Sequence, residues 1–133
     1  MQQHFPRRLD SLTAITTFLS DLTEKLELEP AVSFSVNMAV EELFTNMVKY
    51  NGHGEQDILV AVDRAPGGVE IRLVDFDSEP FDITRIREVD VTAPLEDRSP
   101  GGLGIHLVRK LMDEITYEYK DRRTSIRLFK KHD

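Results

Sequence analysis

The hydrophobic positions in the first half of the chain follow a helical period twice. The first run predicts a helix over about residues 11–27, capped by Asp10 or Ser11, with an apolar face at Leu12, Ile15, Phe18, Leu19, Leu22 and Leu26. A second helix is expected to begin with Pro30, which suits a first-turn position, and to continue to about Tyr50.

Strand-like periods occupy much of the remainder. They predict strands at His4–Leu9, Asp57–Asp63 and Val69–Val74, and two more marked by Ile115, Tyr117 and Tyr119 and by Ile126 and Leu128. Pro6 cannot donate to a ladder, so the first strand is expected at a sheet edge. A third helix is expected over Ile105–Met112. The order strand, helix, helix, two strands, loop, helix and two strands predicts an α+β fold, a two-layer sandwich with helices on one face of a mostly antiparallel mixed sheet.

Composition limits the possible classes of function. A length of 133 residues fits one domain with a real core, and the absence of cysteine excludes disulfides and thiolate chemistry. The formal net charge of −7 disfavours nucleic acid as a partner. The start of the chain has no apolar run of the kind found in signal peptides, and no stretch is long enough to span a membrane, so the expected location is the cytoplasm.

One face of the second helix carries polar residues beside the core. A helix advances about 100° per residue, which places Glu42 and Asn46 together at the edge of the apolar face formed by Val36, Val40, Leu43 and Met47. Glu41 lies farther towards solvent, so Glu42 is the partner of Asn46. Taken alone, this pair is an ordinary polar helix edge.

Two further polar features follow in the chain. Asp75 ends an alternating strand and begins the segment Asp75-Phe76-Asp77-Ser78-Glu79-Pro80-Phe81-Asp82. The turn Gly101-Gly102-Leu103-Gly104 precedes the third helix, after a loop from Glu88 to Pro100 that has little periodicity. Each feature is weak alone, because aspartate often forms turns and a glycine-rich turn is often only a tight bend. A loop of this length in a compact domain is usually functional or disordered.

In their order and spacing, the three features resemble the motifs of the GHKL (Bergerat-fold) ATPase superfamily. Glu42–Tyr50 resembles its first box, Asp75–Asp82 its second and Gly101–Asp113 its third, and the Pro-Phe-Asp ending of the second box favours the branch of anti-sigma-factor serine-protein kinases. The resemblance covers nearly the whole chain. It implies a single ATPase/kinase domain over residues 1–133, with an ATP lid at about residues 84–100.

The resemblance also implies an activity and partners. It indicates an ATP-dependent serine-protein kinase that needs Mg²⁺ and acts as an anti-sigma, partner-switching factor. The implied substrate is a STAS-type anti-anti-sigma protein, and the second partner is a sigma factor or another effector. A homodimer is implied as well, with neither nucleic acid nor membrane as a partner.

The same resemblance assigns roles to individual residues. Glu42 would be the catalytic base and Asn46 the magnesium ligand, because Mg²⁺ prefers oxygen ligands shared with phosphate. Asp75 would accept a hydrogen bond from the adenine amino group. The remaining contacts to ATP would come from Lys49, Phe81, Arg98, Gly101, Gly102, Leu103 and Gly104.

One position departs from the family pattern. Asp77 stands where the family usually has glycine, so its side chain is expected to narrow the adenine pocket and to place a negative charge near phosphate. Two other functions therefore stay open at this point. One is a non-catalytic, nucleotide-dependent binding module, and the other is a stand-alone ATPase domain of the histidine-kinase type.

Overall fold

The computed structural model of the chain describes residues 1–50, 54–77 and 102–132, apart from the side chains of residues 50 and 102–105. Its elements follow the predicted order. They are β1 (Gln2–Phe5), the 3-10 turn η1 (Leu9–Ser11), α1 (Leu12–Lys25), α2 (Pro30–Tyr50), β2 (Ile58–Ala65), β3 (Gly68–Asp75), α3 (Gly102–Leu111), β4 (Glu114–Lys120) and β5 (Arg123–Lys131).

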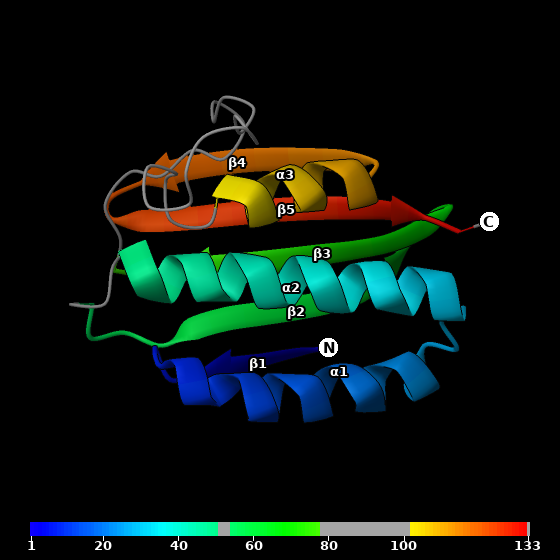
Figure 1. Cartoon of the computed structure of the whole chain (residues 1–133), viewed down its shortest axis with the longest axis horizontal. Helices are drawn as coiled ribbons and strands as arrows, with labels where there is room; N and C mark the ends of the chain where they lie inside the picture. Colours follow the sequence, from blue (N-terminus) through cyan, green and yellow to red (C-terminus); the bar gives the residue numbers. More distant parts are fainter. Residues whose placement is uncertain (51–53, 78–101, 133) are drawn as a thin grey trace.

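The strands form one five-stranded sheet in the order β1-β2-β3-β5-β4. The three helices lie against one face of this sheet, which confirms the predicted α+β sandwich (Figure 1). All four pairs of neighbouring strands are antiparallel. The described part of the sheet is therefore purely antiparallel, whereas a mostly antiparallel mixed sheet was expected. The strand β1 is at the edge, as the proline after it predicts.

A single hydrophobic core fills the space between helices and sheet. Its largest fully buried members come from the helices α1 and α2 and from four of the strands: Phe5, Ile15, Leu19, Leu22, Leu43, Phe44, Ile58, Ile71, Leu73 and Ile126. No helix within the described ranges is both long enough and apolar enough to cross a membrane.

The N-terminal segment differs from the expectation. The first strand ends at Phe5 instead of continuing to Leu9, and three residues separate it from η1. Ser11 occupies the N-cap position of α1, as predicted, but its side chain makes no capping bond to the helix, because its hydroxyl donates to the carbonyl oxygen of Pro6 at 2.7 Å. Asp10 pairs with Arg8. The chain reverses direction between β1 and α1 at the turn η1, and the polar side chains of this turn make local contacts.

The C-terminal end of α2, the end of β3 and the start of α3 lie at the same end of the molecule (Figure 1). The helix α2 contacts both β3 and α3 directly. The three motif-bearing elements, which are far apart in the sequence, are therefore neighbours in the fold.

Candidate functional site

The helix α2 presents its polar residues as the 100° rule predicts. Asn46 is only 1% exposed, whereas Glu42 is half-buried and Glu41 is exposed. Lys49, one turn nearer the C-terminal end, is exposed. The structure thus places Glu42 and Asn46 at the boundary of the core, one turn apart on the helix.

The amide of Asn46 is satisfied on one side only. Its Nδ2 donates to the carbonyl oxygen of Glu42 at 2.8 Å. A carbonyl oxygen can only accept, so the amide nitrogen must face it and Oδ1 must face away. Within the described part of the chain, this buried Oδ1 has no hydrogen-bond partner.

A buried acceptor without a partner costs about 1–3 kcal/mol, and such an atom in a native structure calls for an explanation. A neutral carboxamide oxygen is a ligand that Mg²⁺ accepts, usually together with phosphate oxygens. The chemistry of Asn46 therefore fits a magnesium ion at this place.

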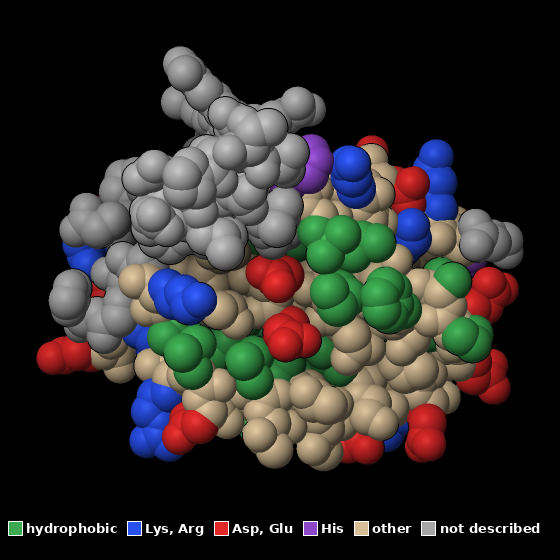
Figure 2. Space-filling model, in the orientation of Figure 1, with side chains coloured by type: hydrophobic (Ala, Val, Ile, Leu, Met, Phe, Trp, Pro, Cys, Tyr) green, Lys and Arg blue, Asp and Glu red, His purple; other side chains and the backbone are tan. Residues whose placement is uncertain are grey.

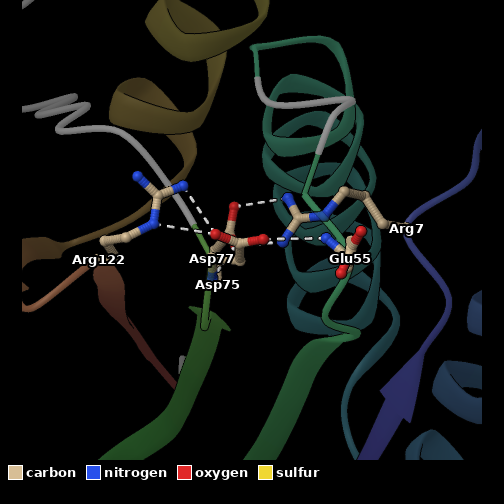
Figure 3. A network of polar contacts seen from close by, with 5 residues as sticks. All are labelled: Arg7, Glu55, Asp75, Asp77 and Arg122. Carbon is tan, nitrogen blue, oxygen red and sulfur yellow. Dashed lines mark hydrogen bonds and ion pairs between the residues drawn. The ribbon is translucent and has the colours of Figure 1, made fainter.

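Asp75 is the last residue of β3 and is 1% exposed. Arg7 makes a bidentate pair with its carboxylate: Nη1 donates to Oδ2 at 2.8 Å and Nη2 donates to Oδ1. The backbone N–H of Asp77 donates to Oδ1 as well, at 3.0 Å. Figure 3 shows Arg7 reaching from the segment after β1 to the end of β3.

The sheet register explains these neighbours. Phe5 pairs with Ile58, and Ile58 pairs with Asp75, so the chain that leaves β1 passes the end of β3 and brings Arg7 there. On the other side, Asp75 pairs with Thr124 of β5, which is 2% exposed. Directly opposite residues have Cβ atoms about 4.5–5.5 Å apart, so the Thr124 hydroxyl belongs to the same neighbourhood.

Sequence reasoning missed both Arg7 and Thr124. Neither lies in a motif, because each reaches the site by strand pairing rather than by spacing along the chain. The only usable signal was the register itself, once β1 and β5 were aligned with β2 and β3.

Asp77 lies beside this group with its carboxylate bound to two structural neighbours. Oδ2 accepts from the backbone N–H of Glu55 at 3.0 Å, and Oδ1 accepts from Nε and Nη2 of Arg122 at 3.0 and 2.7 Å (Figure 3). The Glu55 N–H, followed by Arg122, holds the pKa of this partly buried carboxyl below its usual value. The carboxylate of Asp77, just after β3, thus bonds to the segment before β2 through Glu55 and to the β4–β5 turn through Arg122. Whether Asp77 narrows an adenine pocket stays a prediction.

The third motif is described in part. Gly102, Leu103 and Gly104 form the first turn of α3, where backbone N–H groups lack helical partners and favour a bound anion. Phe81, Arg98, Gly101 and the expected lid at residues 84–100 lie outside the described residues.

Together, the described residues supply three kinds of chemistry at one end of the fold. Asn46 offers a hard oxygen ligand, Asp75 offers a buried hydrogen-bond acceptor, and the start of α3 offers backbone donors. Glu42 adds a half-buried carboxylate one helical turn before Asn46. Such a set suits a phosphorylated ligand with an attached cation and a polar ring.

Comparisons with known proteins agree with this geometry. The sequence model of the family described as histidine kinase-like ATPase domain matches residues 5–130. Serine-protein kinase RsbW of Listeria monocytogenes is 34% identical over 92 residues, which cover 65% of this chain and 58% of that protein. The match thus spans less than two thirds of the curated relative.

Solved structures share the fold at low sequence identity. One is the SiaB–SiaC complex from Pseudomonas aeruginosa, with a TM-score of 0.71, 18% identity and coverage of 97% of this chain and 88% of that chain. Another holds the RsbU and RsbW domains of Rv1364c from Mycobacterium tuberculosis, with a TM-score of 0.71, 13% identity and coverage of 98% and 32%. The histidine kinase AdeS of Acinetobacter baumannii follows with a TM-score of 0.54, 11% identity and coverage of 98% and 67%.

The family match extends over nearly all of the described fold, and this part of the chain includes the buried Asn46, the strand-end Asp75 and the glycine-rich start of α3. The chain belongs to the histidine kinase-like ATPase domain family.

Proposed function

We propose that this protein is an ATP- and magnesium-dependent serine-protein kinase that acts as a partner-switching, anti-sigma regulator. The observation that carries this proposal is the unsatisfied, buried Oδ1 of Asn46, one helical turn from the carboxylate of Glu42. A candidate ligand oxygen and a candidate base on neighbouring turns of one helix are groups that phosphoryl transfer needs from the protein. The chain would act as one ATPase unit over residues 1–133, with residues 84–100 as its lid.

The roles of the residues follow from their positions. Asn46 would hold a magnesium ion, which when bound neutralises charge on the nucleotide phosphates. Glu42 would accept the proton of the attacking serine hydroxyl as the oxygen bonds to the transferred phosphorus and ADP departs. Lys49 is exposed, and its long flexible side chain would contact a phosphate oxygen. Asp75 would accept a hydrogen bond from the exocyclic amino group of adenine.

The remaining nucleotide contacts are proposals of the same kind. Phe81 would pack on the base, and Arg98 with Gly101, Gly102, Leu103 and Gly104 would contact the phosphates. The start of α3 supports the phosphate assignment, because an N-terminal helical turn attracts anions.

The proposed substrate is a serine of a STAS-type anti-anti-sigma protein, and the second partner is a sigma factor or another effector. The helical face offers a surface for such contacts: Phe34 of α2 is 60% exposed and Leu107 of α3 is 37% exposed. Figure 2 shows hydrophobic side chains on this face with acidic side chains between them. Apolar groups with charged neighbours are common at protein interfaces. A homodimer is part of the same proposal.

A phosphotransfer assay with a matched pair of variants tests the activity. Labelled ATP, Mg²⁺ and a purified STAS protein are incubated with wild type, Glu42→Gln or Glu41→Gln. Removing a general base typically costs about 10²–10⁴ in rate, so Glu42→Gln should lose transfer to that extent. Glu41→Gln removes the same charge from an exposed position on the same helix and should transfer normally.

The label itself distinguishes the possible reactions. Acid-stable phosphoserine on the STAS protein is the expected product, whereas acid-labile phosphate would indicate a histidine-kinase-type ATPase domain. Wild type that binds ATP but forms no phosphoserine, or Glu42→Gln that transfers at the normal rate, would contradict the kinase proposal.

A non-catalytic binding module is the second candidate, and one observation favours it. The proposed adenine acceptor, Asp75, already pairs through both oxygens with Arg7. Calorimetric titration with ATP and Mg²⁺ separates the two functions. A protein that takes up no nucleotide and still binds its partner would be an adaptor.

A further inference from the structure

The ion pair between Arg7 and Asp75 is the most deeply buried charged contact among the described residues. The two side chains are 3% and 2% exposed. Arginine and aspartate are almost never buried to this extent unless they are paired. Their position at the end of β3 is also the proposed base-binding position, so the following inference rests on the proposed function.

The hydrogen bonds at Asp75 leave little room for another donor. Oδ1 accepts from Nη2 of Arg7 and from the backbone N–H of Asp77, and Oδ2 accepts from Nη1 of Arg7. An ionised carboxylate offers about four acceptor sites, and three of them are used here. The fourth is almost inaccessible because the carboxylate is shielded from solvent. An amino group of a nucleotide base can reach Asp75 only if the guanidinium moves.

The guanidinium of Arg7 occupies space that is available only because residue 54 is glycine. A Cβ atom at Gly54 would lie 2.6 Å from Nε and 2.7 Å from Cζ of Arg7, and 2.9 Å from the carbonyl oxygen of Asp77. In this position the buried Nε of Arg7 has no hydrogen-bond partner in the described part of the chain. Arg7 is therefore held by its two bonds to Asp75, but its Nε donates no hydrogen bond, and this lowers the free-energy cost of displacing the guanidinium.

We propose that Arg7 is an intramolecular competitor of the nucleotide base for Asp75 and so determines nucleotide affinity. With Arg7 paired, the acceptor is closed. With Arg7 displaced, Asp75 is free to accept from the base, and the segment between β1 and η1 moves with the arginine. The apparent dissociation constant for nucleotide is then the intrinsic one divided by the fraction of molecules in which the pair is open.

The test is a titration of ATP with Mg²⁺ into three proteins, followed by calorimetry. Arg7→Met keeps the length of the side chain and removes its donors. The matched control is Arg8→Met, because Arg8 has the same charge but is 69% exposed and pairs only locally with Asp10. If the pair is open in about a tenth of wild-type molecules, Arg7→Met lowers the dissociation constant about tenfold. Arg8→Met leaves it unchanged.

A second variant keeps the arginine and moves it. Gly54→Ala places a methyl group against Nε and Cζ of Arg7 and against the carbonyl oxygen of Asp77. The arginine end is the flexible one of these groups, so we expect it to move away from Asp75, without a change in the net charge. The substitution should also tighten ATP binding. This variant decides the matter even if Arg7→Met, which leaves Asp75 buried without its cation, fails to fold by circular dichroism.

The outcomes are distinct. Tighter binding in Arg7→Met or in Gly54→Ala, with Arg8→Met like wild type, supports the competition. Equal or weaker binding in the folded variants overturns it while the proposed function stands, provided that wild type binds ATP. If neither wild type nor the folded variants bind ATP, the competition and the proposed kinase function both fail.

Discussion

At the scale of single residues, Asn46 carries the most specific signal in the molecule. Its amide nitrogen has a partner, and its buried oxygen has none in the described part of the chain. Asn46→Ala should remove the oxygen ligand and abolish the dependence of nucleotide binding on Mg²⁺. The fold should lose at most about 1 kcal/mol, because the hydrogen bond to Glu42 disappears while the unsatisfied buried oxygen is removed with it. Calorimetry with ATP, in Mg²⁺ or in EDTA, measures the binding, and urea unfolding measures the stability.

The helix contains a matched control for this substitution. Asn37 donates from Nδ2 to the carbonyl oxygen of Ser33 at 2.8 Å. As in Asn46, the acceptor is the backbone carbonyl one helical turn before the asparagine. Asn37→Ala should cost a similar amount of stability and leave magnesium-dependent binding intact. Equal loss of binding in both variants would mean that Asn46 acts through the helix and not as a ligand.

At the scale of elements, the long periodic segments were predictable and the site was predictable only in part. The bounds of α2 coincide with the prediction because Pro30 fixes its start and its buried apolar face continues to Met47, in the last turn. The prediction for the short N-terminal strand was wrong, since β1 ends at Phe5 and not at Leu9, and the side chain of the N-cap residue Ser11 bonds to Pro6 and not to α1. Local patterns located Glu42, Asn46 and Asp75, which lie within single elements.

The partners of Asp75 come instead from β1 and β5, at sequence separations that no local pattern encodes. Arg7 lies 68 residues away in the sequence and meets Asp75 through two successive strand pairings. Thr124 meets it through a third pairing. A prediction of such contacts requires the order and register of all the strands, which the hydrophobic pattern alone leaves open.

The contacts of Asp77 connect three elements and give stability a dependence on pH. The N–H of Glu55 and the guanidinium of Arg122 lower the pKa of this carboxyl in the folded state. The folded protein therefore binds this proton less readily than the unfolded chain, so the contribution is present at neutral pH and disappears as the pH falls through the folded pKa, below about pH 4. Asp77→Asn should destabilise the protein at pH 7, and its difference from wild type should shrink towards pH 3. Urea unfolding over this range measures the effect.

A suitable control for this prediction is Asp10→Asn. It removes the same charge from an exposed carboxylate that bonds only to the neighbouring Arg8. Surface pairs of this kind contribute about 0–1 kcal/mol, so little change is expected from it at any pH. A difference between Asp77→Asn and wild type that does not decrease at any pH below about 4 would show that the contact does not depend on the ionised carboxyl.

At the scale of the whole molecule, the proposed nucleotide would join elements that are otherwise linked mainly through the core. The end of α2, the end of β3 and the start of α3 come together only in the folded chain (Figure 1). A ligand that needs all three binds the folded state and not the unfolded one. Its binding free energy then adds to the stability of the entire fold.

The size of this effect can be stated in advance. Free ATP with Mg²⁺ at one hundred times its dissociation constant should stabilise the fold by about 2.7 kcal/mol. For a chain of this length that raises the unfolding temperature by roughly 10 °C. Removal of the metal with EDTA should eliminate most of the shift in wild type, because Asn46 then has no cation to hold against the phosphates. In Asn46→Ala the shift should be small with or without the metal. A full shift in EDTA, or an undiminished shift in Asn46→Ala, would mean that the nucleotide binds without the oxygen at the core edge of α2.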